Sequence, residues 1–354
     1  MKNQMIRRYG TPVRFDAYGA SIPLEDAAAV ARRGEELGFA GMWFTESKRP
    51  PFLACAVAST VTSDILLGTA IAVAFPRSPM ITAQTAWELA RASRGRFSLG
   101  LGTQVKAHIE RRFSMTFDHP APRLREYVLA LRAIWRAFQG EPLAFEGDFY
   151  RFSLLTDFFS PGPSEFPDVP ISVAGVNAGM ARLAGEVCDG FHVHPFHSRR
   201  YLQEVIRPAI DTGAASGRRD AASCEVFCPV FTIVGDTDAE QAPQRDSVRR
   251  QLSFYGSTRT YQPVFELHGW GDASEQLHRL MAKGEYDAMT AIITDEMLDV
   301  YAVTSTWDRL APALIARYEG LADRIFSYGP AQDWIGSPEL AERWRTVAAA
   351  FSTH

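Results

Sequence analysis

The chain has 354 residues, of which 46% are hydrophobic, and a formal net charge of −4 at pH 7. That apolar content allows a large buried core, built either as one barrel or as two smaller domains, and the acidic balance argues against a nucleic-acid-binding protein. The first ten residues lack the apolar run of a signal peptide, and no uninterrupted apolar run approaches membrane-spanning length. We therefore expect a soluble, cytoplasmic protein without a membrane segment.

The four cysteines lie in apolar or strand-like segments, at Cys55, Cys188, Cys224 and Cys228. Cys224 and Cys228 have a CxxxC spacing with no histidine nearby, which is not the pattern of a zinc site. A set of buried, reduced thiols is the expectation for a cytosolic protein, and we expect no metal.

Residues 65–104 contain two apolar runs that flank a segment with helical spacing. The first run, 65–73, has the length and β-branched content of a strand that is buried on both faces. Ser78 and Pro79 are typical of an N-cap followed by proline at the first helical position, and Gly95 ends the helix before a second strand at 96–101. This stretch therefore predicts a right-handed βαβ unit.

The same alternation extends in both directions along the chain. Further strands are expected at 13–18, 40–45, 170–174, 190–193, 224–234 and 324–328, with helices at 21–38, 52–62, 78–93, 124–138, 175–187, 198–216, from 237, at 307–321 and at 337–351. Eight strands in alternation with helices predict an α/β fold of the (β/α)8 TIM-barrel type, built as one domain over residues 1–354.

Two longer connections interrupt this alternation, at about 140–170 and 256–305. The first is rich in glycine, proline and aromatic residues, and alternation around Gly147 and Asp148 predicts a small hairpin. Structureless connections of this length are usually functional or disordered. We expect both to be lid-like insertions at the carboxyl-terminal rim of the barrel.

The run GTAIAVAFPRSPMITAQTAWELARASRGRFSLGLGT resembles the third and fourth strands of the bacterial luciferase-like monooxygenase superfamily. Within it and beyond, GTQVKAHIERRFSM is most similar to the branch that uses the deazaflavin coenzyme F420. The resemblance covers the chain from Val13 to about Phe351 and implies a barrel that binds a flavin or deazaflavin. It also implies a homodimer packed through early barrel helices, such as the predicted helix 78–93.

Catalytic candidates stand where strands end, because the carboxyl ends of barrel strands meet at one rim. Glu46 follows the second strand, and the resemblance implies an acidic residue here that faces the cofactor ring; the family often has histidine next, where this chain has Ser47. A rim salt bridge from Glu46 to an arginine is the alternative. His194 follows the sixth strand and is a candidate proton donor, or else a histidine that is simply hydrogen-bonded.

Cofactor-binding candidates come from three further strand ends. Ala70, Ile71 and Ala72 align with a bulge that, in the F420 branch, contains a non-prolyl cis peptide behind the ring, and small residues allow a planar ring to approach. Gly175, Val176, Asn177 and Ala178 open a helix whose backbone N–H groups could bind a phosphate; a tight strand-to-helix connection is the alternative.

A third group of candidates follows the fourth strand, at Thr103, Gln104, His108 and Arg112. If the chain is helical from Lys106, His108 and Arg112 share one face at i, i+4. Such donors suit a ribityl phosphate or an acidic tail; a solvated helix face is the alternative.

These residues predict an oxidoreductase that transfers a hydride between coenzyme F420 and an organic carbonyl, alcohol or activated double bond. One alternative is an FMN-dependent monooxygenase that takes reduced flavin from a partner reductase and reacts with O₂. Another is a flavin-binding relative without catalysis, to which Ser47 would point. Aromatic residues in the two excursions favour an apolar small-molecule substrate; they are Phe149, Tyr150, Phe152, Phe158, Phe159, Tyr255, Trp270 and Tyr301.

Overall fold

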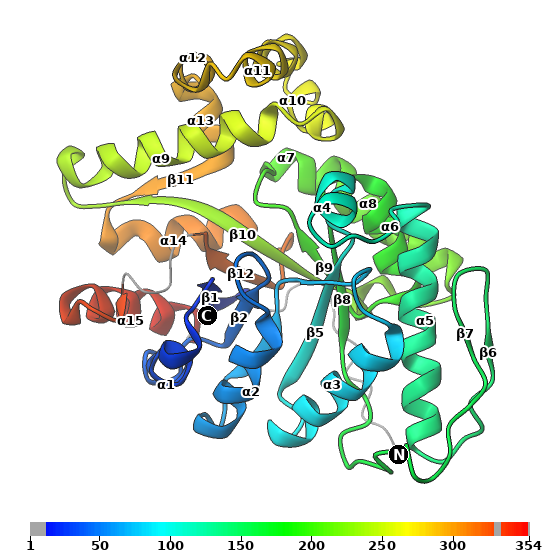
Figure 1. The fold of residues 1–354 in the computed structure, drawn as a ribbon. Coiled ribbons are helices and arrows are strands. Elements are labelled where there is room, and N and C mark those ends of the chain that lie inside the picture. Colours follow the sequence, from blue (N-terminus) through cyan, green and yellow to red (C-terminus); the bar gives the residue numbers. More distant parts are fainter. Residues whose placement is uncertain (1–11, 329–333, 353–354) are drawn as a thin grey trace.

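The computed structural model describes residues 12–328 and 334–352, and these form a closed ring of eight parallel strands surrounded by helices (Figure 1). The ring runs in the order β1 (Arg14–Ala20), β2 (Gly41–Thr45), β3 (Leu66–Thr69), β5 (Phe97–Gly102), β8 (Ile171–Gly175), β9 (Gly190–Val193), β10 (Glu225–Val234) and β12 (Arg324–Ser327). It closes because β12 pairs with both β10 and β1. The predicted (β/α)8 barrel is confirmed.

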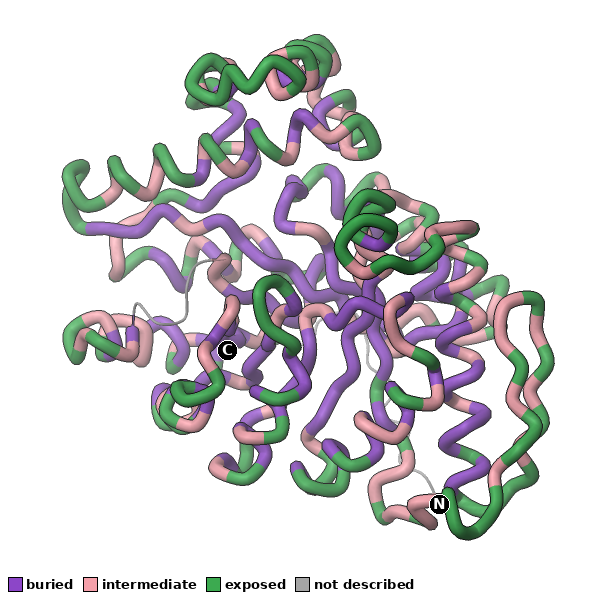
Figure 2. Tube along the Cα trace, viewed as in Figure 1, coloured by how far each residue is buried: buried purple, intermediate pink, exposed green. Residues whose placement is uncertain are grey.

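Each strand is followed by helical structure that packs on the outside of the ring. The outer layer consists of η1 (Leu24–Asp26), α1 (Ala27–Glu36), α2 (Pro51–Val61), α3 (Pro79–Ala92), α4 (Lys106–Arg111), α5 (Pro120–Phe138), α6 (Ala178–Val187), α7 (Arg199–Tyr201), the π-helical turn η2 (Leu202–Ile206), α8 (Arg207–Ser216), η3 (Ala221–Ser223), α14 (Trp307–Tyr318) and α15 (Pro338–Ser352). The Ser78 hydroxyl accepts a hydrogen bond from the Met80 N–H, which confirms the predicted cap of α3. Figure 2 shows the strands almost entirely buried and the exposed residues on the outer helices and excursions.

The first excursion contains the predicted hairpin, with β6 (Phe145–Glu146) antiparallel to β7 (Arg151–Phe152). The Glu126 carboxylate on α5 accepts hydrogen bonds from the N–H groups of Asp148, Phe149 and Tyr150 at 2.5–2.9 Å. The hairpin therefore lies along α5 (Figure 1), not over the barrel mouth as we expected. The reason is topological, because this excursion joins the end of a helix to the start of a strand and so leaves from the amino-terminal side.

The second excursion does lie at the carboxyl-terminal rim, at the top of Figure 1, because it follows the end of β10. It consists of α9 (Asp238–Gly256), η4 (Arg259–Tyr261), α10 (Gln262–Glu266), α11 (Gly271–Lys283), α12 (Tyr286–Ile292) and α13 (Asp295–Tyr301). It ends in a strand that we did not predict, β11 (Ala302–Ser305), which pairs with the outer half of β10. Thus β10 pairs with β12 over residues 227–230 and with β11 over residues 231–234.

The barrel interior is filled by aromatic side chains above one buried ion pair. Trp43, Phe227 and Phe326 pack together inside the ring. Gly68 makes room for them, since a Cβ there would lie 2.2 Å from the Trp43 ring. Below them, Asp16 accepts hydrogen bonds from the Trp43 indole at 2.7 Å and from the Arg324 guanidinium at 2.6 Å.

All four cysteines are buried and free of disulfides, as expected. Within residues 12–328 and 334–352, no cluster of three or more His, Cys, Asp or Glu side chains is placed to hold a metal ion. None of the helices in this described part of the chain is long and apolar enough to cross a membrane.

The buried ion pair gives a first prediction. Asp16→Ala removes the carboxylate shared by Trp43 and Arg324, which are 0% and 4% exposed, and leaves the guanidinium with Glu225 at 3.5 Å. We expect the free energy of unfolding, measured by urea titration, to fall by about 3–5 kcal/mol. As a control, Glu36→Ala removes the exposed ion pair with Arg33 and should cost less than about 1 kcal/mol. Equal effects of the two substitutions would contradict this role of Asp16.

Candidate functional site

The bulge after the third strand stands where the resemblance placed it. β3 ends at Thr69 and resumes as β4 (Ala72–Val73), and the peptide bond between Ala70 and Ile71 is cis, as expected. Ala70 and Ile71 are half-buried, whereas the Ala72 side chain is fully buried. Ala70 and Ile71 therefore present the bulge to the barrel mouth, and Ala72 anchors it to β5.

Glu46 holds this bulge in place. Its N–H donates to the Ile71 carbonyl at 3.2 Å, and its carboxylate accepts from the Val73 N–H at 2.7 Å. Both carboxylate oxygens also accept from the Arg77 guanidinium at 2.8 Å. The structure thus shows the rim salt bridge that was the alternative for Glu46, and the carboxylate contacts the backbone of the bulge.

Arg112 ties the end of β2 to the helix after β5. Residues 106–111 are helical, as expected, and the Arg112 N–H donates to the His108 carbonyl at 3.0 Å. The Arg112 guanidinium donates to the Ser47 carbonyl, and the hydroxyls of Ser47 and Ser21 are hydrogen-bonded. His108 is exposed on α4. The Arg112 side chain is therefore already engaged at the rim, whereas the His108 side chain faces solvent.

Thr103 and Gln104, at the end of β5, bind their own loop. The Thr103 hydroxyl donates to the Gln104 carbonyl at 3.1 Å, and the Gln104 amide oxygen accepts from the Val105 N–H at 3.1 Å. Gln104 has a left-handed backbone with φ of 59°. The side chains of Thr103 and Gln104 are half-buried. They lie at the rim beside the bulge, because the Ala74 N–H, just after β4, donates to the carbonyl of Gly102 at the end of β5.

The β8–α6 turn leaves a helix N-terminus without a side-chain cap. α6 begins at Ala178, and its N-cap residue Asn177 makes no capping hydrogen bond. The Asn177 amide instead donates to the Thr260 carbonyl at 2.7 Å and accepts from the Tyr201 hydroxyl at 3.3 Å. A Cβ placed on Gly179 would meet no atom of the described residues within 4 Å, so among these residues nothing blocks this end of the helix. An uncapped, open N-terminus of a ten-residue helix fits an anionic group such as a phosphate.

Within the same turn, packing accounts for the residue types at positions 175 and 176. A side chain at Gly175 would place its Cβ 2.4 Å from the Cβ of Met180. Val176 is 7% exposed and packs in the core. These two residues shape the turn, and only their backbone is available to a ligand.

His194 lies next to this turn, because its N–H donates to the Gly175 carbonyl at 3.1 Å. The His194 Nδ1 accepts a hydrogen bond from the Phe196 N–H at 3.1 Å, which assigns the ring proton to Nε2. Burial, with a smaller contribution from His197, lowers the pKa of His194 to about 3. At neutral pH the His194 ring is therefore a neutral N–H donor.

Among the residues expected to form the site, Glu46, Ile71, Gly175 and His194 lie at the carboxyl ends of the strands. The hydrogen bonds between Glu46 and Ile71, Ala74 and Gly102, and His194 and Gly175 connect neighbouring strand ends into one row. The two cavities described below lie elsewhere, however. The predicted residues thus form a rim and do not line either of those cavities.

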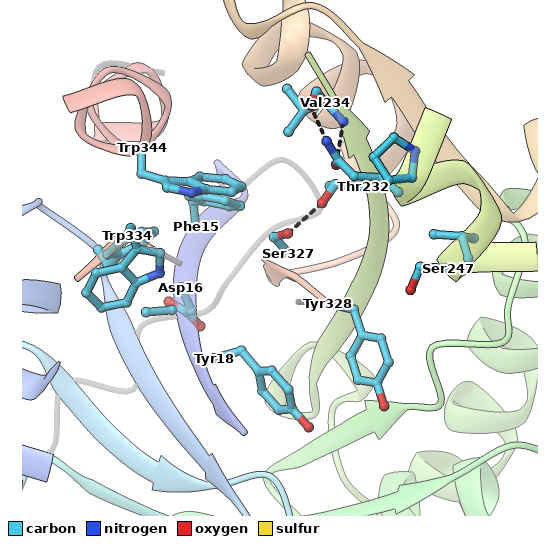
Figure 3. A pocket seen from close by; sticks show the side chains of 15 residues that line it. Phe15, Asp16, Tyr18, Thr232, Val234, Ser247, Ser327, Tyr328, Trp334 and Trp344 are labelled. Carbon is cyan, nitrogen blue, oxygen red and sulfur yellow. Dashed lines mark hydrogen bonds between the residues drawn. The ribbon is translucent and has the colours of Figure 1, made fainter. Parts of the chain in front are cut away.

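The first of those cavities has a volume of about 350 Å³ and lies between β1, β12, the outer half of β10 and helices α9 and α15 (Figure 3). It exists because β10 leaves β12 to pair with β11, and the sheet opens at that point. A second cavity, of about 440 Å³, lies at the opposite, amino-terminal mouth, among residues that begin strands, such as Arg14, Ser98 and Arg324.

Several tyrosines lie at the barrel mouth, and the sequence motifs did not nominate them as site residues. The Tyr255 and Tyr328 hydroxyls are 3.0 Å apart, and the rings of Tyr255 and Tyr261 lie 4.5 and 4.8 Å from His194. Position at the end of the eighth strand was the one sequence signal for Tyr328. Of the aromatic residues expected around a substrate, Tyr255 lies at this mouth, whereas Phe158 is 88% exposed and Tyr301 is buried.

A model of the luciferase-like monooxygenase family matches residues 8–324. The chain belongs to this family. An uncharacterized protein of Mycobacterium tuberculosis is 48% identical over 308 residues, which are 86% of this chain and 91% of that protein. The 5,10-methylenetetrahydromethanopterin reductase of Methanolobus tindarius is 29% identical over 293 residues, which are 81% of this chain and 85% of the reductase.

The same fold is found in the solved structure of the coenzyme F420 dependent tetrahydromethanopterin reductase from Methanopyrus kandleri. It has a TM-score of 0.75 at 18% identity and covers 96% of this chain and 98% of that one. Luciferase-like relatives are F420- or flavin-dependent oxidoreductases and monooxygenases. A flavin or deazaflavin is therefore the class of cofactor that the rim has to fit, and the uncapped end of α6 suits the phosphate of either.

Buried histidines predict how the stability of this site depends on pH. His192 is 4% exposed, and its ring nitrogens have no hydrogen-bond partner within residues 12–328 and 334–352. Burial together with Arg324 lowers its pKa from 6.5 to about 3. The unfolded chain binds the His192 proton more tightly than the folded protein does. The contribution of His192 to the free energy of unfolding is therefore complete above pH 6.5 and is lost as the pH falls toward 3. His192→Phe should flatten the pH dependence of the unfolding free energy between pH 6 and 4 by up to about 1.4 kcal/mol per pH unit.

The measurement is urea unfolding at a series of pH values. His119→Phe, at an exposed position on the surface, is the control and should leave the slope unchanged. An unchanged slope in His192→Phe would show that His192 takes up its proton normally in the folded protein.

Proposed function

We propose that the chain is an oxidoreductase that uses coenzyme F420 to transfer a hydride to or from an organic carbonyl, alcohol or activated double bond. The observation that carries this proposal is the rim itself: the bulge at Ala70 and Ile71, which Glu46 holds, stands in one row of strand ends with the uncapped N-terminus of α6. The 29% identity to a methylenetetrahydromethanopterin reductase supports the same branch.

In this proposal the backbone holds the cofactor and the side chains hold the backbone. The first N–H groups of α6 would bind the phosphate, the bulge would back the ring, and His108 would meet the acidic tail. Glu46 keeps the bulge in position through the Val73 N–H and Arg77, and His194 offers a neutral N–H donor beside the turn. The bound deazaflavin would supply the hydride chemistry.

A second candidate is an FMN-dependent monooxygenase that receives reduced flavin from a partner reductase, which the family's monooxygenase description favours. A phosphate anchor at α6 serves FMN equally well. A third candidate is a flavin-binding relative without catalysis. It rests on Ser47, the position at which the family resemblance implies a histidine; the Ser47 hydroxyl is hydrogen-bonded to that of Ser21.

Titration of the purified protein with F420 and with FMN, each oxidised and reduced, separates these candidates. Tight binding of F420, followed by substrate-dependent oxidation of its reduced form, is expected. Preference for reduced FMN and consumption of O₂ would establish the monooxygenase instead. Binding without turnover of any substrate would point to the third candidate.

Two substitutions test the residues assigned to the cofactor. His108→Ala removes an exposed donor and should weaken F420 binding by roughly 1.5–3 kcal/mol. Asn177→Asp should also weaken it, because a carboxylate at the N-cap would repel a phosphate and would lose the bond to the Thr260 carbonyl. Dissociation constants are measured by fluorescence quenching, with His119→Ala as the control. If both variants bind F420 like the parent protein, the phosphate end of the site has been misplaced.

We also propose that the chain forms a homodimer through its early helices. Leu53 on α2 and Ile81 on α3 are 52% and 56% exposed, which leaves apolar side chains on that face. Sedimentation velocity at micromolar concentration should show a dimer. Ile81→Glu should shift the population to monomer, and a parent protein that sediments as a monomer would contradict this.

A further inference from the structure

The cavity of about 440 Å³ at the amino-terminal mouth of the barrel has no part in the proposed function. Three of the strands around it carry very small residues there: Ser98 on β5, Ser172 on β8 and Gly190 on β9. Ser172 pairs with Gly190 in register, and a Cβ placed on Gly190 would lie 3.2 Å from the Ser172 Cβ and 2.5 Å from the Phe227 ring. These small residues therefore leave space inside this end of the barrel, next to Phe227.

Two buried polar atoms belong to residues that line this amino-terminal cavity. Ser172 is 2% exposed, and its Oγ has no hydrogen-bond partner among the described residues. Arg324 is 4% exposed, and its Nε is likewise without a hydrogen bond in that part of the chain, because the Glu225 carboxylate stands 3.5 Å away. Buried polar groups are normally hydrogen-bonded. A ligand that accepts from the Arg324 Nε–H and also bonds to the Ser172 hydroxyl would satisfy both atoms.

The charged residues of the lining are already compensated. Each is bonded to a group of opposite charge or to a backbone donor: Arg14 to Glu225 at 2.8 Å, Arg324 to Asp16 at 2.6 Å, Asp189 to Arg132 at 2.8 Å, and Asp220 to the Ala222 N–H at 2.9 Å. Within residues 12–328 and 334–352, the lining thus keeps no unpaired charge for an ionic ligand. Because a buried ion without a partner is costly, this lining favours an uncharged ligand.

The remaining walls are apolar, and one of them is firmly held. Leu66 and Phe227 line the cavity, and the Phe227 ring stacks on His192 with centroids 4.3 Å apart and meets the Trp43 ring edge-on at 5.1 Å. A ligand that fits these walls has an apolar body and a small polar edge. A carboxamide has such an edge, since its carbonyl oxygen accepts hydrogen bonds and the adjacent N–H donates them.

We propose that the amino-terminal cavity binds a small, uncharged carboxamide or cyclic amide. The carbonyl oxygen of the ligand accepts a hydrogen bond from the Arg324 Nε–H, its N–H donates to the Ser172 Oγ, and its apolar body packs against Leu66 and Phe227. This site is separate from the cofactor rim, which lies at the opposite ends of the strands, and the inference is independent of the proposed function.

The test uses the full chain and benzamide as the probe, with binding measured by titration calorimetry at pH 7. Benzoate and benzylamine replace the amide by an anion and a cation, and both should bind at least about tenfold more weakly than benzamide. Acetophenone keeps the carbonyl oxygen but lacks the N–H, so it should bind about fivefold more weakly, which corresponds to one neutral hydrogen bond.

Two substitutions of one residue locate the ligand. Ser172→Ala should weaken benzamide binding about fivefold and should abolish the advantage of benzamide over acetophenone. Ser172→Ile fills the space and should abolish binding. The matched control is Ser274→Ala on α11, at the opposite rim, because Ser274 is also 2% exposed and its hydroxyl donates to the Gly256 carbonyl. Ser274→Ala should bind benzamide like the parent protein, and thermal midpoints establish that each variant is folded.

The inference is overturned if the parent protein does not bind benzamide, or if it binds benzoate or benzylamine equally well. Benzamide binding that is unchanged in Ser172→Ala is evidence of a different site and also overturns it. If Ser172→Ile does not fold, Ser172→Ala and the comparison with acetophenone still decide the matter. Titration with F420 is a separate measurement, so failure of this inference and failure of the proposed function are distinguishable.

Discussion

Closure of the barrel between β12 and β1 is the constraint on which the site depends. The two strands are joined by parallel pairing and, inside the ring, by the ion pair between Arg324 and Asp16, which Trp43 completes. A closed ring brings the carboxyl ends of all eight strands to one rim. Without closure, Glu46, Gly175 and His194 would lie on segments that are far apart from one another.

At this rim, polar side chains mainly hold the backbone. Glu46 and Arg77 fix the bulge after β3, Arg112 fixes the end of β2, and Asn177 fixes the loop at Thr260. The groups left for a ligand are backbone N–H groups, small side chains and neutral donors. This arrangement suits a protein whose cofactor performs the redox chemistry, because the protein then has to supply shape, a phosphate anchor and a proton.

Strand β10 pairs with two different strands along its length, and this shapes one side of the barrel. Up to residue 230 it belongs to the barrel, and from residue 231 it belongs to a ribbon with β11 that carries the second excursion. The cavity of about 350 Å³ lies beside this change of partners, and α9, which follows β10, brings Tyr255 to Tyr328. One change of strand pairing thus accompanies both this cavity and the contact between the two tyrosines at the barrel mouth.

The sequence by itself determined the eight strands, the helices between them and the places where strands end, because hydrophobic periodicity, caps such as Ser78 and glycines such as Gly95 act over a few residues. Through resemblance it also indicated the bulge at Ala70 and Ile71. Only the tertiary structure decided that Glu46 contacts Arg77 and Val73, that Asn177 contacts Thr260, and that β11 pairs with β10. It also decided that Tyr255 meets Tyr328 and that the 140–170 excursion lies along α5. These contacts join residues 22–83 positions apart, and local patterns carry no information about which distant side chain a closed fold will bring alongside.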